Sequence, residues 1–163
     1  MQDNSLKRMR SWGYFLILAC FAIDQASKWW ILLDLMNPPA FMPLTPFFAL
    51  VLSWNKGVSF GMLNQLGPWG PHILTAVALC VSIGLGIWFT RARTYWLGFG
   101  LAMIIGGALG NIFDRIYHGA VVDFLYLHWG RFAWPAFNMA DTFITLGVGC
   151  IIFESFLTQK KGE

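Results

Sequence analysis

Four long runs of apolar residues divide the chain, and stretches with more polar or turn-forming residues separate them. The runs cover residues 12–33, 71–89, 96–114 and 137–157. An α-helix needs about 20 mainly apolar residues to cross the hydrocarbon core of a membrane, and each run is close to that length. The pattern therefore predicts an all-α membrane protein, with four transmembrane helices in a single domain of residues 1–163.

The two longer segments outside these runs have the residues of extended chain. Near the start of the first segment, 34–70, residues 37–46 read NPPAFMPLTP, in which four prolines prevent a continuing helix. They go on with FFALVLSWNKGVSFGML, rich in β-branched and aromatic residues, with Asn55-Lys56-Gly57 as a turn. Residues 115–136 contain the strand-like GAVVDFLYLHWG. We predict a small β-cradle or hairpin and a loop on the outer membrane surface.

Composition supports lipid as the solvent and excludes several classes of protein. The chain is 57% hydrophobic and 12% charged, whereas soluble domains average about 25% charged residues. A net charge of +3, spread along the chain, does not indicate a nucleic-acid surface. The three cysteines each lie within an apolar run, which is typical of packing and not of a disulfide or metal site.

Basic residues flank the four runs unevenly. Seven of the 11 Lys and Arg residues fall on one side of the membrane if the spans alternate in direction: Lys7, Arg8, Arg10, Arg91, Arg93, Lys160 and Lys161. Because cytoplasmic loops are enriched in Lys and Arg, this predicts a multi-pass protein with both termini in the cytoplasm.

The N-terminus allows a rival interpretation. Residues 7–20, KRMRSWGYFLILAC, resemble a bacterial lipoprotein signal peptide that ends in a modified cysteine. Against this, the apolar run continues through Ile23, Leu18 stands where such signals prefer a small residue, and three more spans follow. We therefore expect the segment to be part of the first span.

Polar residues in and beside the spans are expected to gather at one depth, near the outer interface. Asp24 and Lys28 lie one helical turn apart and can pair. The others lie at the end of the third span, at the start of the fourth, or in the outer segments: Asn111, Asp114, Arg115, Asn138, Asp141, Asn55 and Asp123. Ionisable residues in spans are costly and mark function by default, although local ion pairs remain the alternative for Asp24–Lys28 and for Asp114–Arg115.

Asp123 and Asp141 are harder to explain without a function. Asp123 is the only charge in an apolar strand, and Asp141 lies at the mouth of a membrane helix. The sequence has no H-E-x-x-H and no Gly-rich phosphate loop, so neither a metal nor a cofactor is expected. Two carboxyl groups can hydrolyse a peptide bond alone, one ionised and one protonated. Burial favours Asp123 as the protonated partner, but the pair titrates as a unit and the assignment stays open.

Four blocks carry a resemblance to a known family: DQASKWW (24–30), NKGVSFG (55–61), GNIFDRIYHGAVVDF (110–124) and FNMADT (137–142). In these blocks the sequence resembles lipoprotein signal peptidase, or signal peptidase II, the bacterial aspartyl peptidase. The resemblance implies that Asp123 and Asp141 are the catalytic pair. It implies supporting or substrate-binding roles for Asp24, Lys28, Asn55, Gly57, Asn111, Arg115, Asn138 and Ala140.

The same resemblance implies a substrate and a location. The substrate would be a prolipoprotein, cleaved just before a cysteine that carries diacylglycerol. The enzyme would work as a monomer among the lipids of the inner membrane, near the periplasmic face, with residues 41–63 as a flap and globomycin as a blocking ligand. The alternative is a small proton-coupled four-helix transporter. Transporter sites tend to lie near the midplane between repeated halves, whereas this sequence has no repeat and its polar residues lie toward one leaflet.

Overall fold

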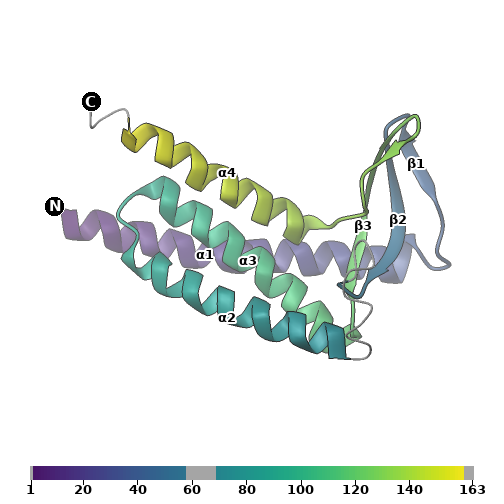
Figure 1. Cartoon of the computed structure of the whole chain (residues 1–163), viewed down its shortest axis with the longest axis horizontal. Helices are drawn as coiled ribbons and strands as arrows, with labels where there is room; N and C mark the ends of the chain where they lie inside the picture. Colours follow the sequence, from purple (N-terminus) through teal and green to yellow (C-terminus); the bar gives the residue numbers. More distant parts are fainter. Residues whose placement is uncertain (1, 58–68, 160–163) are drawn as a thin grey trace.

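The computed structural model describes residues 2–57 and 69–159 and contains four long helices (Figure 1). They are α1 (Gln2–Trp30), which continues as the π-helix η1 (Ile31–Leu35), α2 (Gly70–Arg91), α3 (Tyr95–His118) and α4 (Met139–Gln159). Each is long and apolar enough to cross a membrane. The predicted fold class, four apolar helices with a small sheet, is confirmed.

Local signals set the helix ends. Pro71 lies in the first turn of α2, where a missing N–H costs nothing. The Thr94 hydroxyl accepts a hydrogen bond from the Leu97 amide and caps α3, which stops at Gly119 in a left-handed conformation with φ 73°. Because that stop comes late, residues 115–118 are helical and not part of the outer segment to which the apolar pattern assigned them.

α3 is the central helix and contacts α1, α2 and α4. Glycines on two of its faces permit close approach. A Cβ on Gly106 would come within 2.7 Å of Cys20 and Ile17 of α1, and one on Gly107 would come within 3.0 Å of Ile144 of α4. The absence of side chains at these positions brings the polar residues of α1, α3 and α4 within hydrogen-bonding reach.

Both outer segments join one antiparallel sheet of order β1-β2-β3-β4. Its strands are β1 (Met42–Thr45), β2 (Phe48–Asn55), β3 (Val121–Trp129) and β4 (Phe132–Ala133). β2 pairs with β3 so that Asn55 lies opposite Val121 and Ser53 opposite Asp123. The first hairpin turns between Thr45 and Phe48, earlier than predicted. Gly57, with φ 86°, follows the end of β2, and residues 58–63 of the predicted flap lie outside the described residues.

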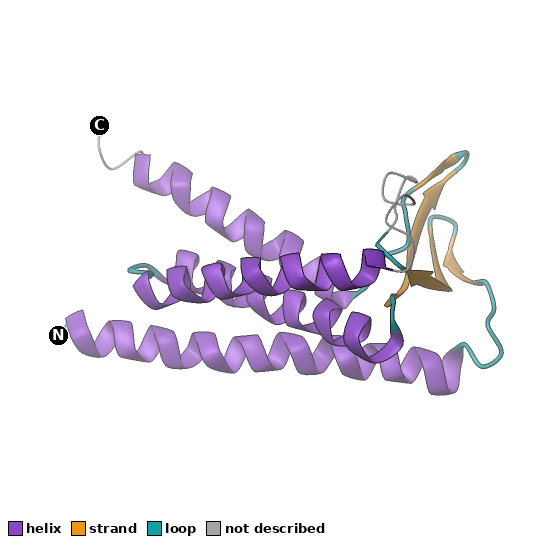
Figure 2. Ribbon diagram, turned by 60° about the horizontal axis from the view of Figure 1, so that its bottom comes forward, coloured by secondary structure: helices purple, strands orange, loops and turns teal. Residues whose placement is uncertain are grey.

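The termini lie at one end of the helices and the sheet at the other (Figures 1 and 2). One apolar core joins α1, α2 and α3, with Met9, Phe89 and Leu101 at its centre. A second lies beneath the sheet, around Ile31 and Phe124. Buried polar residues are concentrated where the sheet meets the helices, so that junction is the place to look for chemistry.

Candidate functional site

The start of α4 fixes Asp141 through a reciprocal cap. The Asn138 amide donates to Asp141 Oδ2 (3.2 Å), and the Asp141 amide donates to Asn138 Oδ1 (3.0 Å). This is the arrangement of a capping box, with Asn and Asp in place of the usual Ser or Thr and Glu. It holds the Asp141 carboxylate in the first turn of a helix, where the helix dipole favours negative charge.

Asn138 also binds Asp123 of β3. Its Nδ2 donates to Asp123 Oδ1 at 2.7 Å, and Asn55 Nδ2 at the end of β2 donates to Asp123 Oδ2 at 3.0 Å. Asn55 is itself held by the Gly57 amide, which donates to its Oδ1 (2.8 Å). The two aspartates therefore contact the same residue, Asn138, although 18 positions separate them in the chain.

Burial is the main influence on the pKa of Asp123, a residue that is only 2% exposed. The pKa of Asp123 is raised to about 6, mainly by loss of solvent, and the negative charge of Asp141 acts in the same direction. Hydrogen bonds from Asn55 and Asn138 act in the opposite direction because they stabilise the ionised form. The direction is the one expected for an aspartate among apolar neighbours.

Arg115 lies in the last turn of α3, within electrostatic range of Asp141, Asp123 and Asp114. One guanidinium nitrogen, Nη1, donates to the Asn111 carbonyl (3.3 Å). The buried Nε has no hydrogen-bond acceptor among the described residues. The side chain thus holds a positive charge and an unused donor beside the two aspartates.

A buried lysine organises the residues behind the aspartates. Lys28 of α1 is 1% exposed, and its ammonium donates to Asp24 (2.8 Å), Asn111 (3.0 Å) and Asp114 (2.9 Å). An ammonium has three donors, so all of them are satisfied. Asn111 links Lys28 to Asp141, because its Nδ2 donates to Asp141 Oδ1 (2.8 Å).

The remaining oxygens of this network join α1 to β3 and α4. Asp24 Oδ1 accepts from the Ala140 amide (2.9 Å). Asp114 accepts from Gln25 Nε2 (2.9 Å) and from the Val122 amide (3.0 Å), one residue before Asp123. Every charged group in the network has several partners, which is the condition under which buried charges are tolerated.

All ten residues singled out in the sequence lie in this region, and two further residues join them. Gln25 and Asp114 were not assigned to the site, and Asp114 pairs with Lys28 and not with Arg115 as the local alternative supposed. The i, i+3 spacing of Asp114 from Asn111 was the available signal. Gln25 carries no charge and gave none.

A cavity of about 320 Å³ lies beside Asp141, between β3 and α4. Its other lining residues are mainly apolar: Leu127, Trp134, Phe137, Thr142, Thr145 and Leu146. An apolar hollow with one carboxylate on its wall has the form of a binding site for an uncharged or apolar chain next to an acid group.

Comparisons with known proteins agree on one family. A profile described as Signal peptidase (SPase) II matches residues 16–157. A lipoprotein signal peptidase of Methylorubrum extorquens is 44% identical over 146 residues, covering 88% of this chain and 84% of that protein. One from Aeromonas hydrophila is 41% identical over 155 residues, covering 93% and 92%. A solved bacterial membrane enzyme, obtained by the in meso method, superimposes with a TM-score of 0.76 at 25% identity, covering 94% and 92%.

Proposed function

Because the chain belongs to the signal peptidase II family, we propose that Asp123 and Asp141 are the catalytic pair with which it cleaves prolipoproteins. The protein is a membrane protease of the aspartic type that removes prolipoprotein signal peptides. The observation that carries the assignment is the position of Asn138, whose side chain and backbone bind one carboxyl group each.

The reaction needs one ionised and one protonated carboxyl group. Asp141 takes a proton from water as the water oxygen attacks the scissile carbonyl carbon, while protonated Asp123 donates its proton to the carbonyl oxygen. In the second step Asp141 gives its proton to the leaving amine, the C–N bond breaks, and Asp123 recovers a proton from the collapsing gem-diol. The raised pKa of Asp123 supports its role as the acid that begins protonated.

Supporting residues hold this pair and bind substrate. Lys28, Asp24 and Asn111 fix the positions of α1, α3 and α4 around the aspartates. The free Nε of Arg115 donates to a substrate carbonyl or phosphate, a task that suits a planar guanidinium. The cavity beside Asp141 receives an apolar part of the signal peptide.

The membrane arrangement is part of the proposal. Cleavage occurs just before a diacylglyceryl-modified cysteine, whose acyl chains stay in the bilayer. The enzyme lies in the inner membrane with both termini cytoplasmic and its aspartates near the periplasmic face. This orientation is supported by the basic residues at the opposite ends of the helices: Lys7, Arg8, Arg10, Arg91 and Arg93. It works as a monomer, residues 41–57 of the predicted flap cover the substrate, and globomycin blocks the same aspartates. A transporter, the other class considered, is not supported, since family and relatives are peptidases.

Cleavage of a lipid-modified prolipoprotein by the purified protein in detergent tests the assignment. Asp123→Asn and Asp141→Asn should each lower the rate by about 10²–10⁴, since each removes a proton-transfer group. The matched control is Asp34→Asn, the same change at an exposed residue of η1, and it should cleave within about twofold of wild type. Near-normal cleavage by either catalytic variant would refute the pair while leaving the fold intact.

A further inference from the structure

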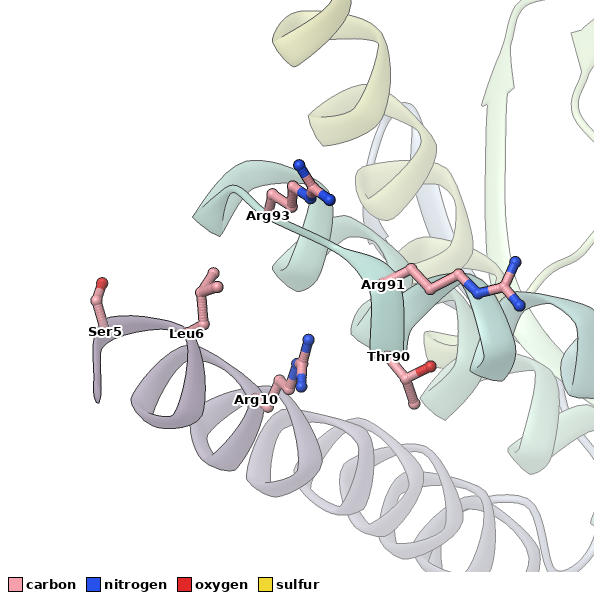
Figure 3. Close-up of a pocket in the computed structure, with 6 residues that line it drawn as sticks. All are labelled: Ser5, Leu6, Arg10, Thr90, Arg91 and Arg93. Atoms are coloured by element: carbon pink, nitrogen blue, oxygen red, sulfur yellow. The ribbon is translucent and has the colours of Figure 1, made fainter. Parts of the chain in front are cut away.

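A second cavity lies at the opposite end of the helices from the aspartates. It measures about 550 Å³, within the range of about 300–1,000 Å³ that ligand sites occupy. Figure 3 shows the residues that line it: Ser5, Leu6, Arg10, Thr90, Arg91 and Arg93. They come from the first turns of α1, the end of α2 and the connection to α3. Nothing in the proposed peptidase reaction uses them.

Positive charge dominates this cavity. Arg10 is half-buried, and its guanidinium extends from α1 toward Thr90, whereas the Arg91 guanidinium points away from Arg10 (Figure 3). Within the described part of the chain, none of the three arginines has an ion-pair partner. Glu154, on α4, does not line the cavity and accepts a hydrogen bond from the Thr94 hydroxyl.

One donor in the cavity is buried without an acceptor. Arg10 Nε has no hydrogen-bond partner among the described residues. A buried, unsatisfied donor costs free energy, more so on a charged group, and an anion supplied from outside would satisfy it. The guanidinium fork matches a phosphate group in particular, because two parallel N–H groups bind two of its oxygens.

Aromatic side chains place this cavity at the level of lipid headgroups. Trp12, Trp88, Tyr95 and Trp96 are all exposed, and each lies within three residues of an arginine of the cavity. Exposed Trp and Tyr residues concentrate at membrane–water interfaces. Leu6 and the exposed apolar faces of the helices adjoin the same opening, so a ligand with a charged head and apolar chains would fit both.

We propose that this cavity binds the phosphate group of an anionic phospholipid. Arg10 and Arg93 bind the phosphate oxygens through their guanidinium groups. A net-negative lipid is preferred over a zwitterionic one because the lining carries three positive charges and no negative one. The proposal concerns a site distinct from the aspartates and does not depend on their role.

Native mass spectrometry of the detergent-purified protein tests this with defined lipids. Phosphatidylglycerol and phosphatidylcholine of identical acyl chains are titrated separately, and inorganic phosphate is added as a competitor. Wild type should retain phosphatidylglycerol in preference. The double variant Arg10→Gln/Arg93→Gln should bind it about 10- to 30-fold more weakly, since each cation near the membrane surface contributes about fivefold. The matched control is Arg8→Gln, an exposed residue two positions from Arg10, which should bind within about threefold of wild type.

Three results would overturn the proposal. The first is equal affinity of the wild type for the two lipids. The second is an equal loss of phosphatidylglycerol affinity in Arg8→Gln and in the double variant. The third is displacement of the lipid by inorganic phosphate at millimolar concentration, which would assign the site to a soluble ion. Unchanged peptidase activity of the double variant in detergent checks its folding. If the double variant does not fold, Arg10→Lys and Arg93→Lys are measured instead, because each keeps the positive charge and loses the guanidinium fork. Each should weaken phosphatidylglycerol binding severalfold, and unchanged binding in both would also refute the site.

Discussion

Replacing Asp123 with Asn should change how the stability of the protein depends on pH. The carboxyl group is 2% exposed, and burial raises its pKa from 3.8 to about 6. In the unfolded chain the group is solvated and titrates near the lower value. The folded protein therefore holds this proton more tightly than the unfolded one does.

The sign and size of the effect follow from linkage between proton binding and folding. Below pH 3.8 both states are protonated, and the contribution of Asp123 to stability is fully present. As pH rises toward 6 the unfolded state releases its proton first, so the wild type loses stability relative to the Asn variant. A difference of about 2 pKa units corresponds to about 3 kcal/mol, most of it lost between pH 4 and pH 6. In the Asn variant the side-chain NH₂ group faces the NH₂ donor of either Asn55 or Asn138. This repulsion lowers the stability of the variant by an amount that does not depend on pH.

Reversible unfolding in mixed micelles between pH 4 and pH 7 measures this difference. The free energy of unfolding of wild type minus that of Asp123→Asn should fall by about 2–2.5 kcal/mol across this range, because part of the total change occurs below pH 4. The matched control is Asp34→Asn, the same substitution at an exposed residue, measured over the same pH range. A difference between wild type and Asp123→Asn that does not change with pH would show that the Asp123 carboxyl group titrates normally, and the argument from burial would be refuted.

Three further substitutions test the network behind the aspartates. Lys28→Met leaves two buried carboxylates without their cation and should lower the free energy of unfolding by about 3–5 kcal/mol; no loss would contradict the ion-pair account. Gly110→Ala places a Cβ against the Asp24 carboxylate and should lower the free energy of unfolding by about 1–3 kcal/mol. Gly149→Ala is the control, because the space around Gly149 is open, and it should not destabilise the protein. Asn138→Ser keeps a capping oxygen but loses the contact with Asp123. The cleavage rate should therefore fall at least tenfold, while the free energy of unfolding changes by only about 1 kcal/mol. Equal effects on cleavage and on stability would assign Asn138 a purely structural role.

The helices were predictable because each apolar run is long enough to cross a membrane by itself. The gathering of Asp24, Lys28 and Asp141 at one depth followed from the same runs, since span direction and helical rise fix depth. The contacts between individual side chains were harder to predict from the sequence. Asp114 has Arg115 beside it in sequence, but the direction of side chains on α3 turns Asp114 toward Lys28 of α1.

The sheet shows a different limit. Both outer segments read as strands, but the pairing of β2 with β3 joins residues such as Ser53 and Asp123, far apart in the chain. Register between distant strands depends on long-range packing, and no local pattern specifies it. The helix ends were uncertain for a simpler reason. Hydropathy marks the part of a helix that lies in lipid, whereas α3 continues to its glycine cap at Gly119.

A double-mutant cycle in kcat/KM, measured on the lipid-modified substrate, tests most directly whether Asp123 and Asp141 act as one unit. Groups that share one proton-transfer step fail together, so Asp123→Asn/Asp141→Asn should be no more than about threefold slower than the slower single variant. Losses that multiply, with the double variant slower by the product of the two single effects, would mean that the two carboxyl groups act independently, and the account of a joint reaction would be contradicted.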